Sequence, residues 1–145
     1  MVYYAQMIPT ASALRLVAPR SEHKLRPIDV VRRGLESASL DRLARLLHIS
    51  AEELGRIIGV SRATLHRRRS SRARLKPDES DRVFRVASAL AAATELFENA
   101  DSGAEWLRTP NPVFEGKRPL DLLDTAIGFD EVIRLIGRIE NGIGP

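Results

Sequence analysis

The chain has 145 residues, of which 43% are hydrophobic and 29% are charged, a composition typical of a folded globular protein rather than a disordered or fibrous one. It contains no cysteine, which excludes a disulfide framework, a thiolate zinc site and a cysteine nucleophile. The net charge is +4, and no apolar run is long enough to span a bilayer or to form a secretory leader, so we expect a cytoplasmic protein with no membrane partner.

Residues 1–27 are predicted to form a mostly irregular N-terminal arm. Three prolines interrupt the segment, and its apolar residues show little periodicity. From Ile28 onward the apolar residues recur at helical spacing as far as Leu47. This spacing predicts either two helices or one bent helix after the arm.

Two short helices separated by a tight turn are predicted next. Ser50 and Glu53 have the spacing of a capping box, so a helix is expected to begin directly after Ser50. Gly59 is expected to end that helix, and Ser61 can cap the next one. A helix, a turn containing glycine and a second helix form a helix-turn-helix, in which the second helix enters the major groove of DNA. Residues 28–76 are therefore predicted to be a DNA-binding module.

The second helix of this pair lies in a strongly basic segment. Seven basic residues and no acidic residue occur between Ser61 and Lys76, which is the pattern expected of a phosphate-binding surface. The alternative interpretation, a solvated helix face, is disfavoured because such a face normally carries interspersed acids. Leu65 is expected to face the core. The predicted DNA-binding residues are Ser61, Arg62, Thr64, His66, Arg67, Arg68 and Arg69.

A long helix is predicted after the basic segment. Pro77 suits a first helical position, and the acids that follow it interact favourably with the positive end of the helix dipole. Apolar and small residues then recur at helical spacing up to Phe97. Residues 77–145 are predicted to form this long helix and a C-terminal module that it joins to the DNA-binding module.

The remainder of the chain is predicted to be helical and acidic. Short helices are expected at about residues 104–108 and after Pro119, with a last helix at about residues 129–140, and no strand-like alternation appears. Nine acidic residues and three basic residues occur between Glu95 and Glu131. The predicted fold class is all-α: a helix-turn-helix module joined by a long helix to a small helical C-terminal module.

No catalytic residue, metal site or cofactor is predicted. Asp121 and Asp124 share one face of a helical turn, but no third ligand, basic partner or phosphate-binding loop is expected to accompany them. The three histidines, His23, His48 and His66, lack the spacing of metal ligands. We expect His48 to end a helix and His66 to face DNA.

Several motifs between Leu35 and Gly142 are similar to those of one protein family. Residues 58–67 carry its helix-turn-helix motif, and residues 75–82 carry the motif that opens the long helix. The more specific motifs are Ala104-Glu105-Trp106-Leu107, Pro110-Asn111, the run from Arg118 to Thr125, and Gly128-Phe129-Asp130-Glu131-Val132. On these residues the chain resembles the Xre/MbcA/ParS family of antitoxins, which partner RES-domain toxins. One departure is Val113-Phe114-Glu115-Gly116, where two glycines are expected, and it affects at most the conformation of this loop.

The resemblance implies an antitoxin of a bacterial type II toxin-antitoxin system. Its partners are then a RES-domain toxin that consumes NAD, which it neutralises by direct contact, and the double-stranded DNA of its own operator, at which it represses transcription. One short recognition helix reads too few base pairs for tight specific binding. We therefore expect a homodimer within a larger toxin-antitoxin complex.

The residues expected to bind the toxin lie in the C-terminal module and its tail. Trp106 either packs against the long helix, the interpretation favoured for a lone tryptophan, or contacts the partner, since tryptophan is enriched in binding hot spots. The tail either frays, as chain ends commonly do, or lies near the mouth of the toxin's active site, as the resemblance implies. The predicted toxin-binding residues are Trp106, Leu107, Glu140, Asn141, Gly142, Ile143, Gly144 and Pro145.

Two other functions are alternatives to this one. A free-standing transcriptional regulator would use the C-terminal half to dimerise or to sense a ligand, and its gene would have no RES-like neighbour. A recombinase or nuclease with an appended helix-turn-helix is disfavoured because the rest of the chain is short and lacks a nucleophile with its base.

Overall fold

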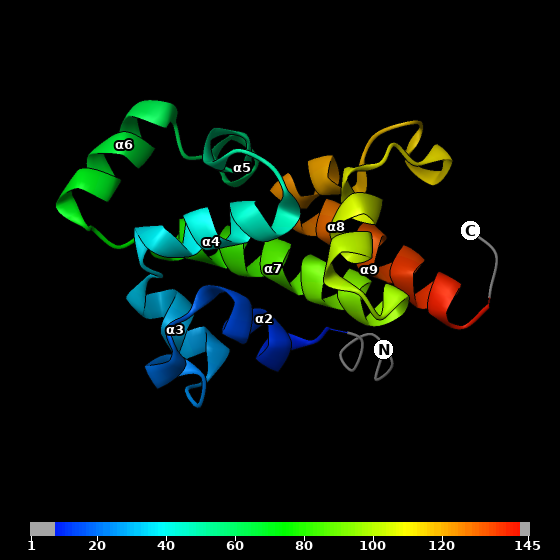
Figure 1. The fold of residues 1–145 in the computed structure, drawn as a ribbon, viewed down its shortest axis with the longest axis horizontal. Coiled ribbons are helices and arrows are strands. Elements are labelled where there is room, and N and C mark those ends of the chain that lie inside the picture. The colour runs from blue at the N-terminus through cyan, green and yellow to red at the C-terminus, as the bar shows by residue number, and fades with distance from the viewer. Residues whose placement is uncertain (1–7, 143–145) are drawn as a thin grey trace.

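The computed structural model describes residues 8–142, in which shorter helices surround one long central helix (Figure 1). The α-helices are α2 (Thr10–Val17), α3 (Pro27–Arg33), α4 (Ser37–Leu47), α5 (Ala51–Ile58), α6 (Arg62–Ser71), α7 (Pro77–Phe97), α8 (Ala100–Arg108) and α9 (Ala126–Glu140); the 3-10 helices are η1 (Arg20–Glu22), η2 (Pro112–Phe114) and η3 (Pro119–Asp124). Strand-like pairing in these residues is limited to two isolated bridges. None of the helices described is both long and apolar enough to cross a bilayer. The predicted all-α class is confirmed.

Helix α7 is the element against which most of the others pack. Its 21 residues contact α2, α3, α4, α5, α8 and α9. Many of its buried positions are alanine, which lets neighbouring helices come close: Ala87, Ala89, Ala91, Ala92 and Ala93. At Gly103 of α8 an added Cβ would lie 2.8 Å from the backbone nitrogen of Thr94, so the approach of α8 to α7 requires a residue without a side chain.

The N-terminal segment is helical and packed, so the prediction of an irregular arm is wrong over the described residues. Helix α2 packs against α4 and α7 and buries Ala13, Leu14 and Val17. The prolines that were expected to disrupt the segment instead flank its helices: Pro9 precedes α2, Pro19 precedes η1 and Pro27 is the first residue of α3. A proline at a helix start lacks only an N–H that has no helical partner there, so it delimits helices without breaking them.

Two helices, rather than one bent helix, follow this segment. Gly34 ends α3 with a φ of 92°, and an added Cβ at this residue would collide with the carbonyl oxygen of Leu75. The backbone N–H of Leu35 donates to Ser80 Oγ at 2.8 Å, and the N–H of Leu75 donates to the carbonyl of Leu35 at 2.8 Å. These bonds hold the α3–α4 junction against the start of α7.

Helices α8 and α9 begin a few residues earlier than predicted because a side chain caps each of them. Asn99 Oδ1 accepts the N–H of Ser102 at 2.9 Å, and Thr125 Oγ1 accepts the N–H of Gly128 at 3.0 Å. Between them, Glu115 has a φ of 56°, a left-handed conformation that glycine adopts at lower cost. This residue lies in the loop where two glycines were expected.

Candidate nucleic-acid interface and partner-binding module

The helix-turn-helix consists of α5 and α6, and local hydrogen bonds define both helices. Ser50 Oγ accepts the N–H of Glu53 at 3.0 Å at the start of α5, and Ser61 Oγ accepts the N–H of Thr64 at 3.1 Å at the start of α6. Gly59 ends α5 with a φ of 80°. The predicted N-caps and the predicted turn are therefore confirmed, but the reciprocal half of the capping box is not seen, because the Glu53 carboxylate pairs with Arg118 of the C-terminal module.

The inner side of α6 is fixed by one apolar residue and one ion pair. Leu65 is buried, as predicted. Arg68 is buried beside it and donates to Glu79 of α7, which also accepts the backbone N–H of Lys76 at 2.8 Å. The sequence placed Arg68 among the DNA-binding residues, but its guanidinium points into the protein. The cause is Glu79, a carboxylate that needs a buried partner.

Arg69 is also engaged within the protein. Its guanidinium donates to Asp41 of α4 and lies 3.9 Å from a carboxylate oxygen of Glu52 on α5. The hydrogen bond with Asp41 raises the pKa of Arg69 above its ordinary value. Arg69 therefore ties α6 to α4 and α5, and its charge is largely balanced by these two acids.

Four residues of the predicted set are exposed on α6 and its cap: Ser61, Arg62, His66 and Arg67, which we call the α6 face. Within residues 8–142 neither Arg62 nor Arg67 has an ion pair or a hydrogen bond to its side chain. Thr64 is half-buried, and its Oγ1 accepts the hydroxyl of Ser61 at 2.9 Å. The structure thus separates the predicted set into an exposed face and the two paired arginines, Arg68 and Arg69.

A contact that the sequence did not indicate joins this module to the C-terminal one. Arg118, just before η3, donates to Asp121 at 2.6 and 2.9 Å and lies 2.8 Å from a carboxylate oxygen of Glu53 on α5. Asp121 is the largest cause of a raised pKa for Arg118, and Arg118 in turn lowers the pKa of Asp121. Asp121 therefore has a basic partner, contrary to expectation, and does not form a free carboxylate pair with Asp124.

In the C-terminal module, Leu107 and Trp106 have different environments. Leu107 has 0% of its surface exposed, so its expected contact with a toxin is corrected: it belongs to the core. Trp106 is half-buried against the core, and its ring lies 6.3 Å from that of Phe97 at the end of α7. Packing against the long helix was the favoured interpretation of this tryptophan, and the structure shows that contact.

The last described residues continue beyond α9 into the tail. Glu140, Asn141 and Gly142 are exposed, and Asn141 Nδ2 donates to the carbonyl of Gly137 at 2.7 Å. The other predicted tail residues, Ile143, Gly144 and Pro145, lie outside the described residues. On the body of the module, Ile127 at the start of α9 is 77% exposed, the highest value for a large apolar residue in the described part of the chain.

Comparison with known proteins matches both modules. The family described as the antitoxin Xre-like helix-turn-helix domain matches residues 26–88, and the antitoxin Xre/MbcA/ParS C-terminal toxin-binding domain matches residues 92–142. The chain is 33% identical to an antitoxin Xre of Yersinia enterocolitica over 80% of this chain and 79% of that protein. It is 30% identical to an antitoxin Xre of Photorhabdus laumondii over 79% of this chain and 78% of that protein. A Sphingobium protein named Prs ADP-ribosylating antitoxin is 25% identical over 86% of each chain.

Proposed function

Because this chain belongs to the Xre family of antitoxins, with a helix-turn-helix domain and a toxin-binding domain, we propose that it neutralises a RES-domain toxin that consumes NAD and represses its own operon. It acts by binding, without catalysis. The observation that carries the proposal is the presence, on one chain, of an exposed basic recognition helix and a separate module that matches a toxin-binding domain.

The features of α6 support binding to operator DNA. Arg62 and Arg67 are exposed and without an acidic partner in residues 8–142, so their guanidinium groups are available to guanine edges or phosphates. His66 lies between them on the same exposed face. Because Ser61 and Leu65 fix the start and the inner side of α6, this face is presented on a rigid helix.

The features of the C-terminal module support binding to a toxin. The exposed Ile127 is an apolar side chain on a folded surface, which suits a protein partner. The name of the Sphingobium relative refers to ADP-ribosylation, a reaction in which NAD supplies the ADP-ribose, and this supports a partner that consumes NAD. Trp106 contributes through the module's packing, and the tail residues Glu140 to Pro145 approach the toxin's substrate pocket.

The assembly that binds DNA is a homodimer within the toxin complex. A pair of α6 helices meets two half-sites about 34 Å apart on one side of the duplex, so the operator is palindromic. Sedimentation of the free protein and footprinting on the upstream DNA check this. A monomer that protects one short asymmetric site contradicts it.

Co-expression with the neighbouring gene tests the proposal as a whole. We expect a RES-domain protein to be encoded there, to copurify with this chain, and to arrest growth and deplete NAD only when this chain is absent. Operator binding together with no toxic neighbour and no copurifying protein would instead identify a free-standing transcriptional regulator.

A further inference from the structure

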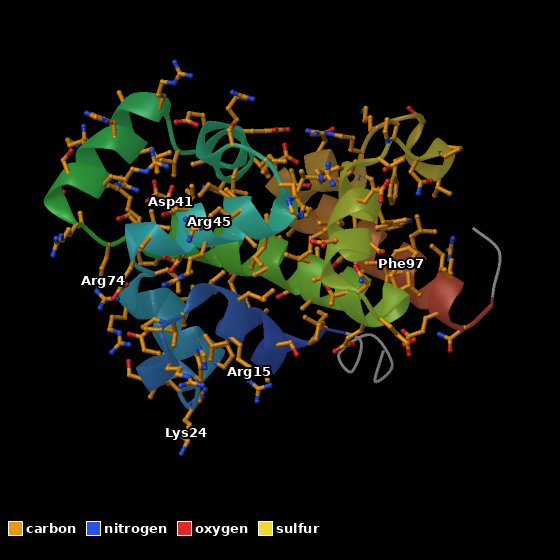
Figure 2. The ribbon with its side chains drawn as sticks, in the orientation of Figure 1. Arg15, Lys24, Asp41, Arg45, Arg74 and Phe97 are labelled. Atoms are coloured by element: carbon orange, nitrogen blue, oxygen red, sulfur yellow. The ribbon has the colours of Figure 1, made fainter. Side chains whose placement is uncertain are left out.

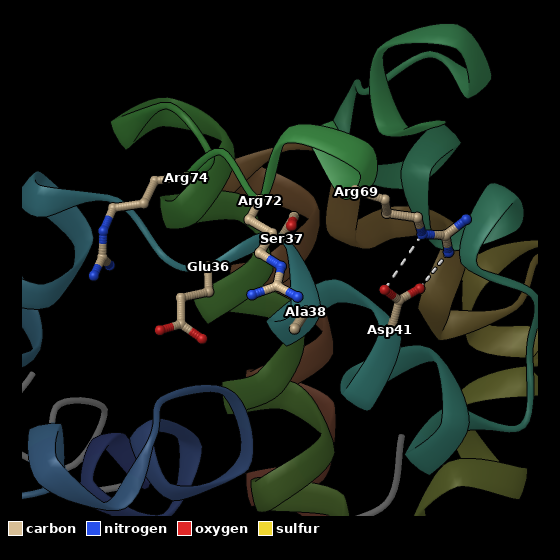
Figure 3. A pocket seen from close by; sticks show the side chains of 7 residues that line it. All are labelled: Glu36, Ser37, Ala38, Asp41, Arg69, Arg72 and Arg74. Carbon is tan, nitrogen blue, oxygen red and sulfur yellow. Dashed lines mark hydrogen bonds and ion pairs between the residues drawn. The ribbon is translucent and has the colours of Figure 1, made fainter. Parts of the chain in front are cut away.

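A groove of about 590 Å³ lies where the C-terminal end of α6 meets the N-terminal end of α4 (Figure 3). Three arginines and two acids line it, together with two small residues of the first turn of α4. Arg72 is the residue that ends α6, so the groove begins where the recognition helix stops. Of the residues that line the groove, only Arg69 belongs to the predicted DNA-binding set.

The charges in the groove leave one guanidinium free. Arg69 and Asp41 are paired with each other, as the dashed lines in Figure 3 show. Arg74 donates one hydrogen bond to the carbonyl of Gly34 at 2.8 Å and is otherwise exposed. Arg72 is exposed and has no ion pair with any residue in the range 8–142. With the Arg69–Asp41 pair set aside, two guanidinium groups face one carboxylate, that of Glu36, and the groove retains a positive charge.

The α4 side of the groove supplies neutral hydrogen-bond donors. The residue before the helix, Glu36, makes no side-chain cap, so the backbone N–H of Ala38 lacks the partner that a cap could give, whereas the N–H of Ser37 belongs to the backbone bridge between Glu36 and Arg74. Ser37 has only 7% of its surface exposed, lines the groove, and its hydroxyl has no hydrogen-bond partner in residues 8–142. This hydroxyl is open to the groove, so a ligand there with acceptor oxygens can accept its hydrogen bond.

We propose that this groove binds a phosphate group, and that in the DNA complex the group is a backbone phosphate flanking the bases read by the α6 face. A phosphate offers acceptor oxygens to the Ser37 hydroxyl and the Ala38 N–H, and a negative charge to Arg72 and to the positive end of the α4 dipole. The assignment to DNA rests on the proposed function. It is supported by the position of the groove, which is continuous with the end of α6. A free phosphate ion has the same chemistry, so the experiment must separate the two sources.

The DNA arm measures affinity as a function of salt for Arg72→Gln, with Arg15→Gln as the matched control. Arg15 is an exposed arginine on α2, far from α6 (Figure 2). Loss of one phosphate contact lowers the slope of log affinity against log salt by about 0.9 and weakens operator and unrelated DNA by the same factor. Ser37→Ala is expected to weaken binding to both DNAs without changing the slope, because serine carries no charge, and Arg72→Lys, which keeps the charge, should also retain the slope. Arg15→Gln should match the wild type.

The phosphate arm adds inorganic phosphate to the free protein and follows the amide resonances of Ser37 and Ala38 by NMR. Shifts in the wild type that disappear in Arg72→Gln support the groove as a phosphate site. Shifts together with an unchanged DNA slope in folded Arg72→Gln overturn its assignment to DNA. If phosphate shifts neither amide resonance in the wild type, and Arg72→Gln leaves the DNA slope unchanged, the groove is not a phosphate site. Wild-type protein that binds phosphate here but fails to bind its operator overturns the proposed function and leaves the phosphate site standing.

Discussion

Among the basic residues of α6, the position of the nearest carboxylate decides what each arginine does. Arg68 faces Glu79 and Arg69 faces Asp41, whereas Arg62 and Arg67 face solvent. Removing one partner of a buried pair leaves an uncompensated charge and costs about 3–5 kcal/mol of stability. A substitution at Arg68 should therefore impair folding, and it cannot serve as a test of DNA contact.

The double substitution Arg62→Ala with Arg67→Ala tests the α6 face. If each arginine contributes about 1–3 kcal/mol through a base edge, operator affinity should fall at least about thirtyfold. Gel-shift titration at fixed salt measures this, and copurification with the toxin should be unaffected. The matched control is Arg15→Ala with Arg32→Ala, which removes two exposed arginines from α2 and α3. Unchanged operator affinity in the α6 double variant would remove α6 from the DNA interface.

The ion pair between Arg118 and Asp121 makes stability depend on acid pH. Because Arg118 lowers the pKa of Asp121 in the folded state, the carboxylate contributes stability above its unfolded pKa, near 3.9, and this contribution is lost as pH falls through the lower folded pKa. Asp121→Asn should lower the melting temperature at pH 7, and its deficit should shrink towards pH 3. Asp124→Asn, which removes an exposed carboxylate of the same 3-10 helix, is the control. A deficit that stays constant with pH would show that the pair does not stabilise the fold.

For the helices, the capped starts are set by residues close in sequence, whereas the contacts between helices join residues far apart in sequence. Ser50, Ser61, Asn99 and Thr125 cap helices through bonds that span three residues. The contact of α8 with α7 depends instead on small residues, and the contact of η3 with α5 includes Arg118, which reaches Glu53 across 65 positions of the chain. The two modules are therefore joined both by α7 and by a polar contact beside it.

Gly103→Ala tests the close packing of α8 on α7. The added methyl group would meet backbone atoms of Ala93 and Thr94 at 2.9 and 2.8 Å, so the helices must separate. Overpacking of this kind costs about 1–3 kcal/mol, despite the higher helix propensity of alanine. Thermal unfolding measures the loss, and Ser102→Ala at the exposed neighbouring position should change stability little. A stability equal to the wild type would mean that α8 can move away at no cost.

At the scale of the whole molecule, the two proposed binding regions lie at different ends of α7. The basic helix α6 precedes the start of α7, and the C-terminal module packs around its later turns (Figure 1). DNA and a toxin can then bind one chain without competing for the same surface. The ion pair of Arg118 with Glu53 of α5 directly connects the C-terminal module with the helix-turn-helix, so a change in one module on binding its partner can affect the other through this contact.

Deletion of residues 140–145 tests how the toxin is silenced. The body of the module is expected to supply most of the affinity and the tail to supply the blockade, so the truncated chain should still copurify with the toxin but fail to protect cells. Trp106→Ala is the complementary variant, because loss of its packing against Phe97 should weaken the complex or the fold. Full protection by the truncated chain would show that inhibition works without the tail.

Features whose causes lie within one helical turn could be predicted from the amino-acid sequence. The N-cap at Ser50, the left-handed turn at Gly59, the cap at Ser61 and the start of α7 at Pro77 all follow from bonds or φ preferences among neighbouring residues. For this reason the helix-turn-helix and the long helix could be predicted with nearly correct bounds. The family motifs added the identity of the C-terminal module.

Which of these residues remain available to partners depends on the packing of the helices in three dimensions. Arg68 and Arg69 form ion pairs with acidic residues 11 and 28 positions away, and Leu107 is buried in the core rather than at a surface. The helical N-terminal segment likewise depends on burial against α4 and α7, because an eight-residue helix is marginal in water without packing. The free energy of burial and charge pairing depends on distant groups meeting in space, and a pattern of neighbouring residues does not contain that information.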